Sequence, residues 1–542
     1  MEQLQSEWWR NGIIYQVYPR SFLDSNNDGI GDLNGITSKL PYIKSLGVDA
    51  VWLSPFFKSP MADFGYDVSD YRDVDPMFGD MKDFDRLIEE AHDNGLKVII
   101  DQVYSHTSDQ HAWFEESRQS RDNPKADWYV WVDTLPDGNP PNNWVSVFGG
   151  SSWKWDTRRK QYYLHNFLTE QPDLNVHNPE VQDQLLSDLR FWLDRGVDGF
   201  RLDAINFCCH NPSLADNPAK FDTLEGYGDK IPTNQYDYQW HVNDKTQPET
   251  ERFLQRIREV LDEYPGTMAV GEIGDDNMIP TMTRYTTENR LHCAYSFELL
   301  STDCDAPFIR RVVSDAKQLI NEGWACWSIG NHDVPRVMTR WNKEDSPLAL
   351  KEKRIALFWL MQFTLRGNTC IYQGEELGLD EAEIAFEDLQ DPYGINLWPE
   401  FKGRDGCRTP MPWVASLPHA GFSSAKPWLP VPESHTARSV DVMEADRDSL
   451  LHRFRHLTEW KRAQPWLTLA ELELTEDNPN VLTYIRTHND DRYFVAINLS
   501  HETQTLQQRL QGEDLTPKGF AYTLHDGEVT LPAAGAMVIK IN

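Results

Sequence analysis

The 542-residue sequence lacks several features that would place it quickly in a class of protein. It contains no run of about 18 apolar residues, which is the length a membrane-spanning helix needs. Residues 1–19 contain acidic side chains and no apolar core of a secretory signal. The seven cysteines are scattered and lack CxxC spacing, which argues against a disulfide framework and a zinc site. We therefore expect a cytoplasmic protein with reduced thiols and no membrane partner.

Basic residues are also scarce, with 52 Lys and Arg against 85 Asp and Glu, and the formal net charge is −33. Such a charge repels nucleic acid and anionic membrane surfaces. Aromatic residues are plentiful, with 20 Trp, 20 Tyr and 24 Phe, and they suit either sugar stacking or a large aromatic core. The composition favours a neutral small-molecule substrate and predicts no nucleic-acid partner.

One pattern recurs along the chain: an amphipathic helical stretch, a glycine and a short apolar run, as in residues 41–56, 87–106 and 189–207. The glycine is typical of a helix C-terminus, and the apolar run is typical of a parallel strand buried on both faces. We expect long helices over 248–264 and 348–365. Strands are predicted near residues 12–18, 50–55, 97–103, 198–203, 267–272, 292–297, 325–330 and 368–372. Eight strands of this kind indicate an α/β fold, a closed (β/α)₈ TIM barrel.

Two parts of the chain depart from this pattern. Residues 107–175, after the third strand, are rich in Trp, Asn, Gly, Pro and Asp and predict an inserted subdomain. Residues 468–542 contain short alternating strands separated by turns, which predict a C-terminal antiparallel β-sandwich. The barrel is then expected over 1–106 and 176–467.

Polar side chains at the carboxyl ends of the predicted strands are the first candidates for a functional site, because those ends face the mouth of a barrel. An isolated acid at such a position is usually a helix cap or an ion-pair partner. Here six polar residues occupy predicted strand ends, which favours a catalytic site. They are Asp203, Glu272, Asp333, Arg201, His106 and His332.

Several segments carry a family resemblance. DQVYSH, GFRLDAINF, GEI and SIGNHD, with QPDLN in the insertion, resemble the signature regions of the α-amylase superfamily, glycoside hydrolase family 13. The resemblance covers nearly the whole chain. WWRNGIIYQVYPRSF and GRDGCRTPMPW resemble the branch that contains α-glucosidases and oligo-1,6-glucosidases. This implies an α-retaining glycosidase.

The resemblance implies unequal roles for three carboxyl groups: Asp203 as nucleophile, Glu272 as acid/base, and Asp333 as binder of the 2- and 3-hydroxyls. A retaining glycosidase holds its nucleophile and acid roughly 5–5.5 Å apart. Arg201 lies two residues before Asp203 on the same strand face, so we expect it to keep that aspartate ionised by lowering its pKa. Glu272 must hold its proton near neutrality.

The same resemblance implies a pocket that is closed beyond one glucose, and therefore exo cleavage. Asp63 and Tyr66 would grip the non-reducing sugar, with Arg404 paired to Asp63. Phe148 and Phe167 are expected either as walls of the pocket or as packing residues of the insertion. The full set of expected substrate-binding residues is Asp63, Tyr66, His106, Phe148, Phe167, Arg201, Ala204, His332 and Arg404.

Ala204, which follows the expected nucleophile, bears on linkage. In relatives, alanine or threonine there accompanies α-1,4 preference and valine accompanies α-1,6 preference, a difference worth only about 1–3 kcal/mol. We therefore expect maltose and short α-glucosides as substrates, with transglucosylation as a side activity. Residues 208–247 exceed a normal loop and are expected to cover the acceptor side.

A structural divalent cation, Ca²⁺ or Mg²⁺, is predicted in the loop DSNNDGIGD. Oxygen ligands at alternate positions of a tight loop suit a hard cation. Gly35 stands where an EF-hand has its last glutamate, so the loop is not an EF-hand. The expected ligands are Asp24, Asn26, Asp28, the carbonyl of Ile30, and Asp32. A metal-free turn is the alternative, and no organic cofactor is expected.

Other enzymes and one binding protein of the same fold remain as alternatives. An oligo-1,6-glucosidase differs only in linkage, and a glucosyl-transferring isomerase that makes trehalose or isomaltulose shares the chemistry before the intermediate. GEI and the absence of an Arg-Leu-Asp-Arg cluster argue against the isomerases. A non-catalytic transporter heavy chain would have an anchor and would have lost catalytic acids. We expect a monomeric enzyme.

Overall fold

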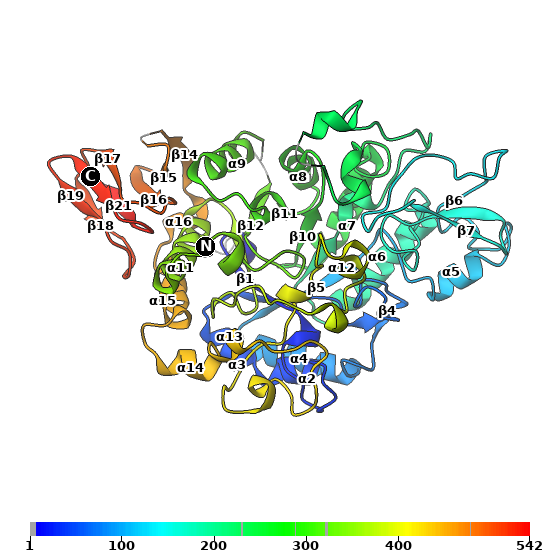
Figure 1. Ribbon diagram of the computed structural model, residues 1–542, viewed down its shortest axis with the longest axis horizontal. Coiled ribbons are helices and arrows are strands. Elements are labelled where there is room, and N and C mark those ends of the chain that lie inside the picture. The colour runs from blue at the N-terminus through cyan, green and yellow to red at the C-terminus, as the bar shows by residue number, and fades with distance from the viewer. Residues whose placement is uncertain (1–6, 229–230, 288, 320–322, 477) are drawn as a thin grey trace.

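Eight parallel strands close into a barrel in the computed structural model, which describes residues 7–228, 231–287, 289–319, 323–476 and 478–542 (Figure 1). Around the barrel the strands follow one another in chain order, and β13 closes the ring by pairing with β1. They are β1 (Ile13–Val17), β2 (Ala50–Leu53), β5 (Lys97–Val103), β9 (Gly199–Asp203), β10 (Met268–Ile273), β11 (Cys293–Ser296), β12 (Trp324–Ser328) and β13 (Asn368–Tyr372).

The fold class expected from the sequence is confirmed. Each of the eight predicted strands is present, and the largest differences in a boundary are two residues, as at the ends of β2 and β12. Most positions of these strands are buried, which explains why the sequence shows continuous apolar runs there and little polar alternation.

Local signals explain where the surrounding helices begin and end. Asp80 accepts from the backbone of Asp83 and thereby caps the helix that follows it. Gly47 and Gly95 have φ angles of 80° and 70°, which are left-handed values that favour glycine after a helix. The helices that pack around the barrel are α2 (Leu33–Ser38), α3 (Leu40–Ser45), α4 (Met81–Asp93), α6 (Pro179–Leu193), α7 (Pro248–Asp262), α8 (Met278–Thr286), α9 (Ala306–Leu319), α11 (Leu348–Thr364) and α15 (Leu450–Arg462).

The chain between β5 and α6 forms the expected insertion. It contains a short helix and a three-stranded antiparallel sheet, seen in cyan at the right of Figure 1. Its two ends meet where His106 pairs with Asp173 in an isolated antiparallel bridge. The insertion therefore returns to the barrel mouth beside its starting point. Its elements are α5 (Ala112–Ser117), β6 (Trp131–Val132), β7 (Trp153–Asp156) and β8 (Gln161–Leu164).

The C-terminal strands form two antiparallel sheets at the left of Figure 1. Apolar side chains of both sheets, including Phe494, Leu506 and Val529, share one buried cluster. The five-stranded sheet contains β14 (Glu471–Thr475), β15 (Val481–His488), β16 (Asp491–Asn498), β21 (Ala536–Ile541) and β18 (Gly512–Asp514). The three-stranded sheet contains β17 (Gln504–Gln507), β20 (Glu528–Leu531) and β19 (Thr523–His525). The two sheets form the expected sandwich.

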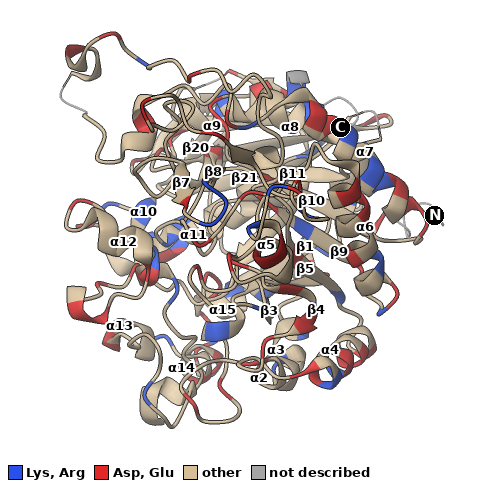
Figure 2. Cartoon of the chain, turned by 90° about the vertical axis from the view of Figure 1, so that its right-hand side faces the viewer, with Lys and Arg blue, Asp and Glu red and all other residues tan. Residues whose placement is uncertain are grey.

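Acidic residues are distributed over many elements and are not gathered in one of them (Figure 2). Among the described residues, no helix combines the length and the apolar character required to cross a bilayer.

His292, next to β11, is buried away from the barrel mouth and gives a test of how burial affects stability. The amide of Ala269 donates to its Nδ1 over 3.1 Å, and burial, with smaller effects of Arg258 and Arg10, lowers the His292 pKa to about 3. The unfolded chain takes up a proton below pH 6.5 and the folded chain does not, so stability is lost as pH falls from about 6.5 towards 3. Between pH 8 and pH 5 we expect wild type to lose about 2 kcal/mol more than His292→Gln in urea unfolding.

His525 is the matched control, because its side chain is 87% exposed. His525→Gln is expected to keep the pH dependence of the wild type. The same pH dependence in His292→Gln as in wild type would contradict the burial argument.

Candidate active site

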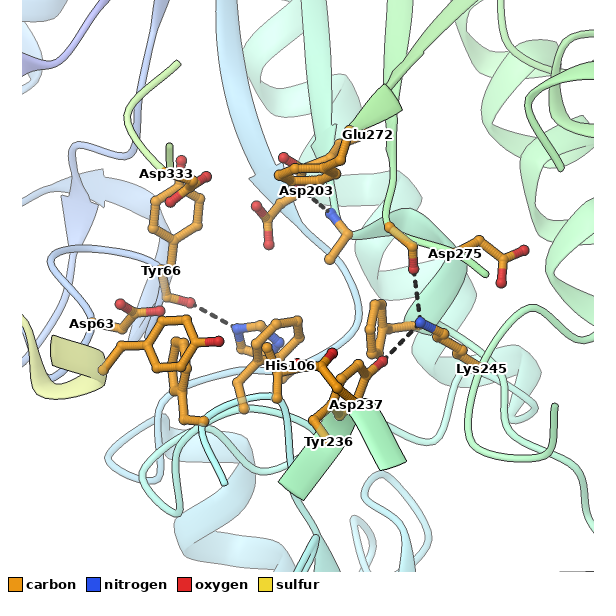
Figure 3. Close-up of a pocket in the computed structure, with 18 of the residues that line it drawn as sticks. Asp63, Tyr66, His106, Asp203, Tyr236, Asp237, Lys245, Glu272, Asp275 and Asp333 are labelled. Carbon is orange, nitrogen blue, oxygen red and sulfur yellow. Dashed lines mark hydrogen bonds between the residues drawn. The ribbon is translucent and has the colours of Figure 1, made fainter. Parts of the chain in front are cut away.

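The barrel mouth and the insertion enclose a cavity of about 380 Å³. This volume lies within the range of roughly 300–1,000 Å³ that is common for small-molecule sites. Most of the predicted site residues line it, and Figure 3 shows several of them pointing into it. The lining set includes Asp63, Tyr66, His106, Phe148, Phe167, Asp203, Ala204, Glu272, Asp333 and Arg404.

The three expected catalytic carboxyl groups come from the ends of different strands. Asp203 is the last residue of β9 and Glu272 is the penultimate residue of β10, and these two strands are neighbours in the barrel. Asp333 lies in the turn after β12. Because the strands are parallel, residues far apart in the chain meet at one mouth.

Arg201 forms ion pairs with three carboxyl groups at the barrel mouth. Its guanidinium is fully buried and pairs with Asp203 over 2.5 Å, with Asp101 over 2.8 Å, and with Glu272. Tyr295 donates its hydroxyl to Glu272 over 2.8 Å. One guanidinium that binds both Asp203 and Glu272 holds them close together, as a retaining mechanism requires.

The pKa of Asp203 in this cluster differs from the expectation. Burial raises the pKa of Asp203 well above its ordinary value, and Arg201 opposes this shift without overcoming it. Burial likewise raises the pKa of Asp101 to about 7. The expected net lowering of the Asp203 pKa is therefore wrong, because burial disfavours the ionised form and the nearby carboxyl groups of Glu272 and Asp101 add to this effect.

Asp333 forms ion pairs with two other arginines. Arg408 pairs with it over 2.9 Å and Arg404 over 3.4 Å. Burial acts to raise the Asp333 pKa, but its neighbours His332, Arg408 and Arg404 hold it below its ordinary value. Asp333 is therefore ionised, which suits a residue that accepts hydrogen bonds from sugar hydroxyls.

An ion-pair network closes the cavity at the end near Asp63. The guanidinium of Arg404 donates to Asp63 over 2.8 Å and twice to Asp391, which also accepts from the Arg404 backbone amide. All three side chains are buried, and Gln171 also donates to Asp63. The network therefore places paired, buried polar groups at this end of the cavity.

The two histidines of the site have lowered pKa values. Burial lowers the pKa of His106 to about 4 and that of His332 well below its ordinary value. The hydroxyl of Tyr66 lies 2.7 Å from Nε2 of His332, and the two rings stack with their centroids 5.4 Å apart. His332 and Arg201 therefore lie behind the cavity wall and support residues that line it.

Phe148 and Phe167 both reach the cavity from the insertion. Their ring centroids are 6.0 Å apart, and Phe167 also lies 5.1 Å from His106. The structure thus favours the prediction that they form the pocket wall over the alternative that they only pack the insertion.

Ala204 has a left-handed backbone, with φ 37° and ψ 43°. This conformation turns its N–H towards Glu272, to which it donates over 3.0 Å. A β-branched residue is strained at positive φ, so alanine is well suited to this position.

Several site residues were not identified from the sequence. Asp101 lies in the DQVYSH segment. Arg408 lies four residues after Arg404 in the GRDGCRTPMPW segment. The signal that could have identified these two residues is their position within segments that resemble family motifs. Asp391, Tyr295 and the acceptor-side residues carry no comparable pattern, because only the fold brings them to the mouth.

The predicted cation loop is a series of tight turns. Asp24 accepts from the amides of Asn26, Asn27 and Gly29, and Asp32 caps α2 through Gly35. Across the part of the chain that the structure describes, no three His, Cys, Asp or Glu side chains are grouped as metal ligands. The loop is held by its own hydrogen bonds, and the cation stays a prediction.

The closed parallel barrel and its carboxylate mouth define the chain as a (β/α)₈ protein with the acidic site of a glycosidase. The family model described as Alpha amylase, catalytic domain, matches residues 16–470. The chain belongs to this family, the α-amylase family of glycoside hydrolases.

Individual relatives cover nearly the whole chain. A "Probable alpha-glucosidase" of Rhizobium meliloti is 52% identical over 539 residues, which are 99% of this chain and 97% of that protein. An "Oligo-1,6-glucosidase" of Heyndrickxia coagulans is 38% identical, covering 93% and 94%. The crystal structure of an α-glucosyl transfer enzyme superposes with a TM-score of 0.94 at 52% identity, covering 99% of both chains.

The closing network can be tested by removing its cation. Arg404→Met leaves Asp63 and Asp391 buried without their partner, which is expected to cost about 3–5 kcal/mol in the free energy of unfolding. Lys402→Met, two residues away, removes a lysine that is 53% exposed and pairs with Glu383, so it should cost at most about 1 kcal/mol. Urea unfolding measures both. Equal costs would show that the Arg404 network adds nothing beyond a surface ion pair.

Proposed function

We propose that the protein is an exo-acting, retaining α-glucosidase that removes terminal glucose from maltose and short α-glucosides. The observation that carries the proposal is the Asp63–Arg404–Asp391 network, which closes one end of the cavity beside three carboxyl groups. A cavity closed at one end accepts a chain terminus, whereas an open cleft would accept an internal bond. The names of the relatives support the same assignment.

The proposed reaction is a double displacement. Asp203 attacks the anomeric carbon while Glu272 gives a proton to the leaving oxygen, so that a glucosyl ester forms on Asp203. Glu272 then takes a proton from water, which attacks the same carbon from the side that the leaving group vacated. Two inversions release glucose with its α configuration.

We further propose a preference for α-1,4 bonds, with transfer to sugars as a side activity. Ala204 supports the linkage preference, since its small side chain leaves room beside the scissile oxygen. The transfer enzyme among the solved relatives supports the side activity. An oligo-1,6-glucosidase and a glucosyl-transferring isomerase remain the alternatives, and product analysis separates them.

The test is incubation with maltose, isomaltose, sucrose and trehalose, followed by chromatography of glucose and of new disaccharides. Maltose is expected to be hydrolysed fastest, and glucose is expected to exceed any new disaccharide. Asp203→Asn should lose at least about 10³-fold in kcat, because the nucleophile is removed while the shape is kept. Unaltered hydrolysis by Asp203→Asn would refute the mechanism, and faster cleavage of isomaltose than of maltose would refute the linkage.

The structural cation is a further proposal. The loop offers two buried carboxylates, Asp24 and Asp32, and exposed oxygens of Asn26 and Asp28, with the carbonyl of Ile30 nearby. If Ca²⁺ or Mg²⁺ binds there, saturating cation should raise Tm by about 2 °C, since a ligand at 100 times its Kd adds about 2.7 kcal/mol. Asp28→Asn should weaken this shift. Identical Tm values with chelator and with cation would favour the metal-free turn.

We also propose that the protein works as a cytoplasmic monomer. Its seven cysteines are all free, as expected in a reducing compartment.

A further inference from the structure

The end of the cavity away from Asp63 is built from a different set of residues. Figure 3 shows Asp63 and Tyr66 on one side of Asp203 and Glu272, and Lys245 with Asp275 on the other. If glucose lies at the closed end, the second group lies where the leaving sugar departs and where an accepting sugar arrives. Its side chains decide which molecules compete for the glucosyl group.

Lys245 is a buried cation at this end, and its side chain lines the cavity with only 3% of the residue exposed. Nζ donates to the hydroxyl of Tyr236 over 2.7 Å and to the carbonyl of Gly274 over 2.9 Å. Nζ also lies 4.9 Å from the centre of the Phe207 ring. A lysine held in this way is unusual, because burying an ammonium group costs free energy unless the group is paired or hydrogen-bonded.

The position of Nζ is tied to both catalytic strands. Gly274 lies two residues after Glu272, and Asn206 lies three residues after Asp203. Asn206 donates to the carbonyl of Gly274 over 3.0 Å and to the hydroxyl of Thr246 over 3.0 Å. The end of the 208–247 segment is thereby fixed to the turns that follow both carboxyl groups. Residues 229–230 of that segment lie outside the described residues.

An ammonium group has three N–H bonds, and the structure gives Nζ two hydrogen-bond partners. The third N–H is available to a ligand on the cavity side. Asp237 and Asp275 line the same end and offer carboxylate acceptors. A charged donor beside acceptors matches a sugar, whose hydroxyl groups both accept and donate.

We propose that Lys245 determines acceptor specificity by donating its third N–H to a hydroxyl of the leaving or accepting sugar. The inference rests on the proposed α-glucosidase function and adds the recognition of the second sugar. By binding a hydroxylated acceptor next to Glu272, Lys245 favours sugar over water in the second displacement. A substrate whose leaving group has no hydroxyls gains nothing from this contact.

The test compares two substrates that share the glucose but differ in the leaving group. Lys245→Met is expected to lower kcat/KM for maltose about tenfold, mainly through KM, which matches the loss of one charged hydrogen bond. kcat/KM for phenyl α-glucoside should stay within about twofold, because its aromatic ring carries no hydroxyl or other polar group for Nζ. At high maltose concentration, the ratio of transfer product to glucose should fall with the variant.

Tyr236→Phe is the matched control, because it removes one anchor of Nζ but keeps the ammonium and the ring. It should change the ratio of the two kcat/KM values less than Lys245→Met does, and Lys245→Arg should restore part of the ratio. Thermal unfolding checks that the variants are folded. Equal losses of kcat/KM on both substrates would show that Lys245 only positions Gly274. Unchanged kinetics would show that Lys245 has no role in recognising the second sugar. Either result overturns the proposal. If wild type hydrolyses neither substrate, the α-glucosidase proposal itself fails and this inference fails with it.

Discussion

The site depends on one buried guanidinium shared by three carboxyl groups. Arg201 contacts Asp101, Asp203 and Glu272, which come from β5, β9 and β10. Without a buried cation these side chains would repel each other at the barrel mouth, and their burial would be too costly. With it they are held close together, but the compensation is incomplete. Burial raises the pKa of Asp203 well above its ordinary value, and Arg201 opposes this shift without overcoming it.

The two ends of the cavity use charge in different ways. At the glucose end, Arg404 and Arg408 come from one short segment and are paired with acids on several sides, so the wall is rigid and closed. At the acceptor end, Lys245 is fixed by a hydroxyl and a carbonyl, and its charge faces the cavity. Under the proposed function, the first arrangement fixes where glucose binds. Under the same proposal, the second leaves an N–H donor of Lys245 for the accepting molecule, which is either water or a sugar.

Much of the fold was predictable because its signals are local. Gly47 and Gly95 end helices in left-handed conformations that their own residue type allows. The barrel strands are buried on both faces, so apolar runs such as the one in β5 identify them without information from other parts of the chain. Asp203, Glu272 and Asp333 were identifiable because each lies at the end of such a strand or in the turn after it, within a recognisable motif.

The amino-acid sequence by itself determined the barrel, the order of its strands and the carboxyl groups at its mouth, because propensity, periodicity and motif all act over a few residues. Only the tertiary structure decided how charge is shared among them. The expected lowering of the Asp203 pKa considered Arg201 alone, whereas the fold also brings in Asp101, Glu272 and deep burial. Asp391, Tyr295 and Lys245 reach the site from distant segments. Burial and Coulomb energy depend on distances through space, and no pattern of neighbouring residues contains them.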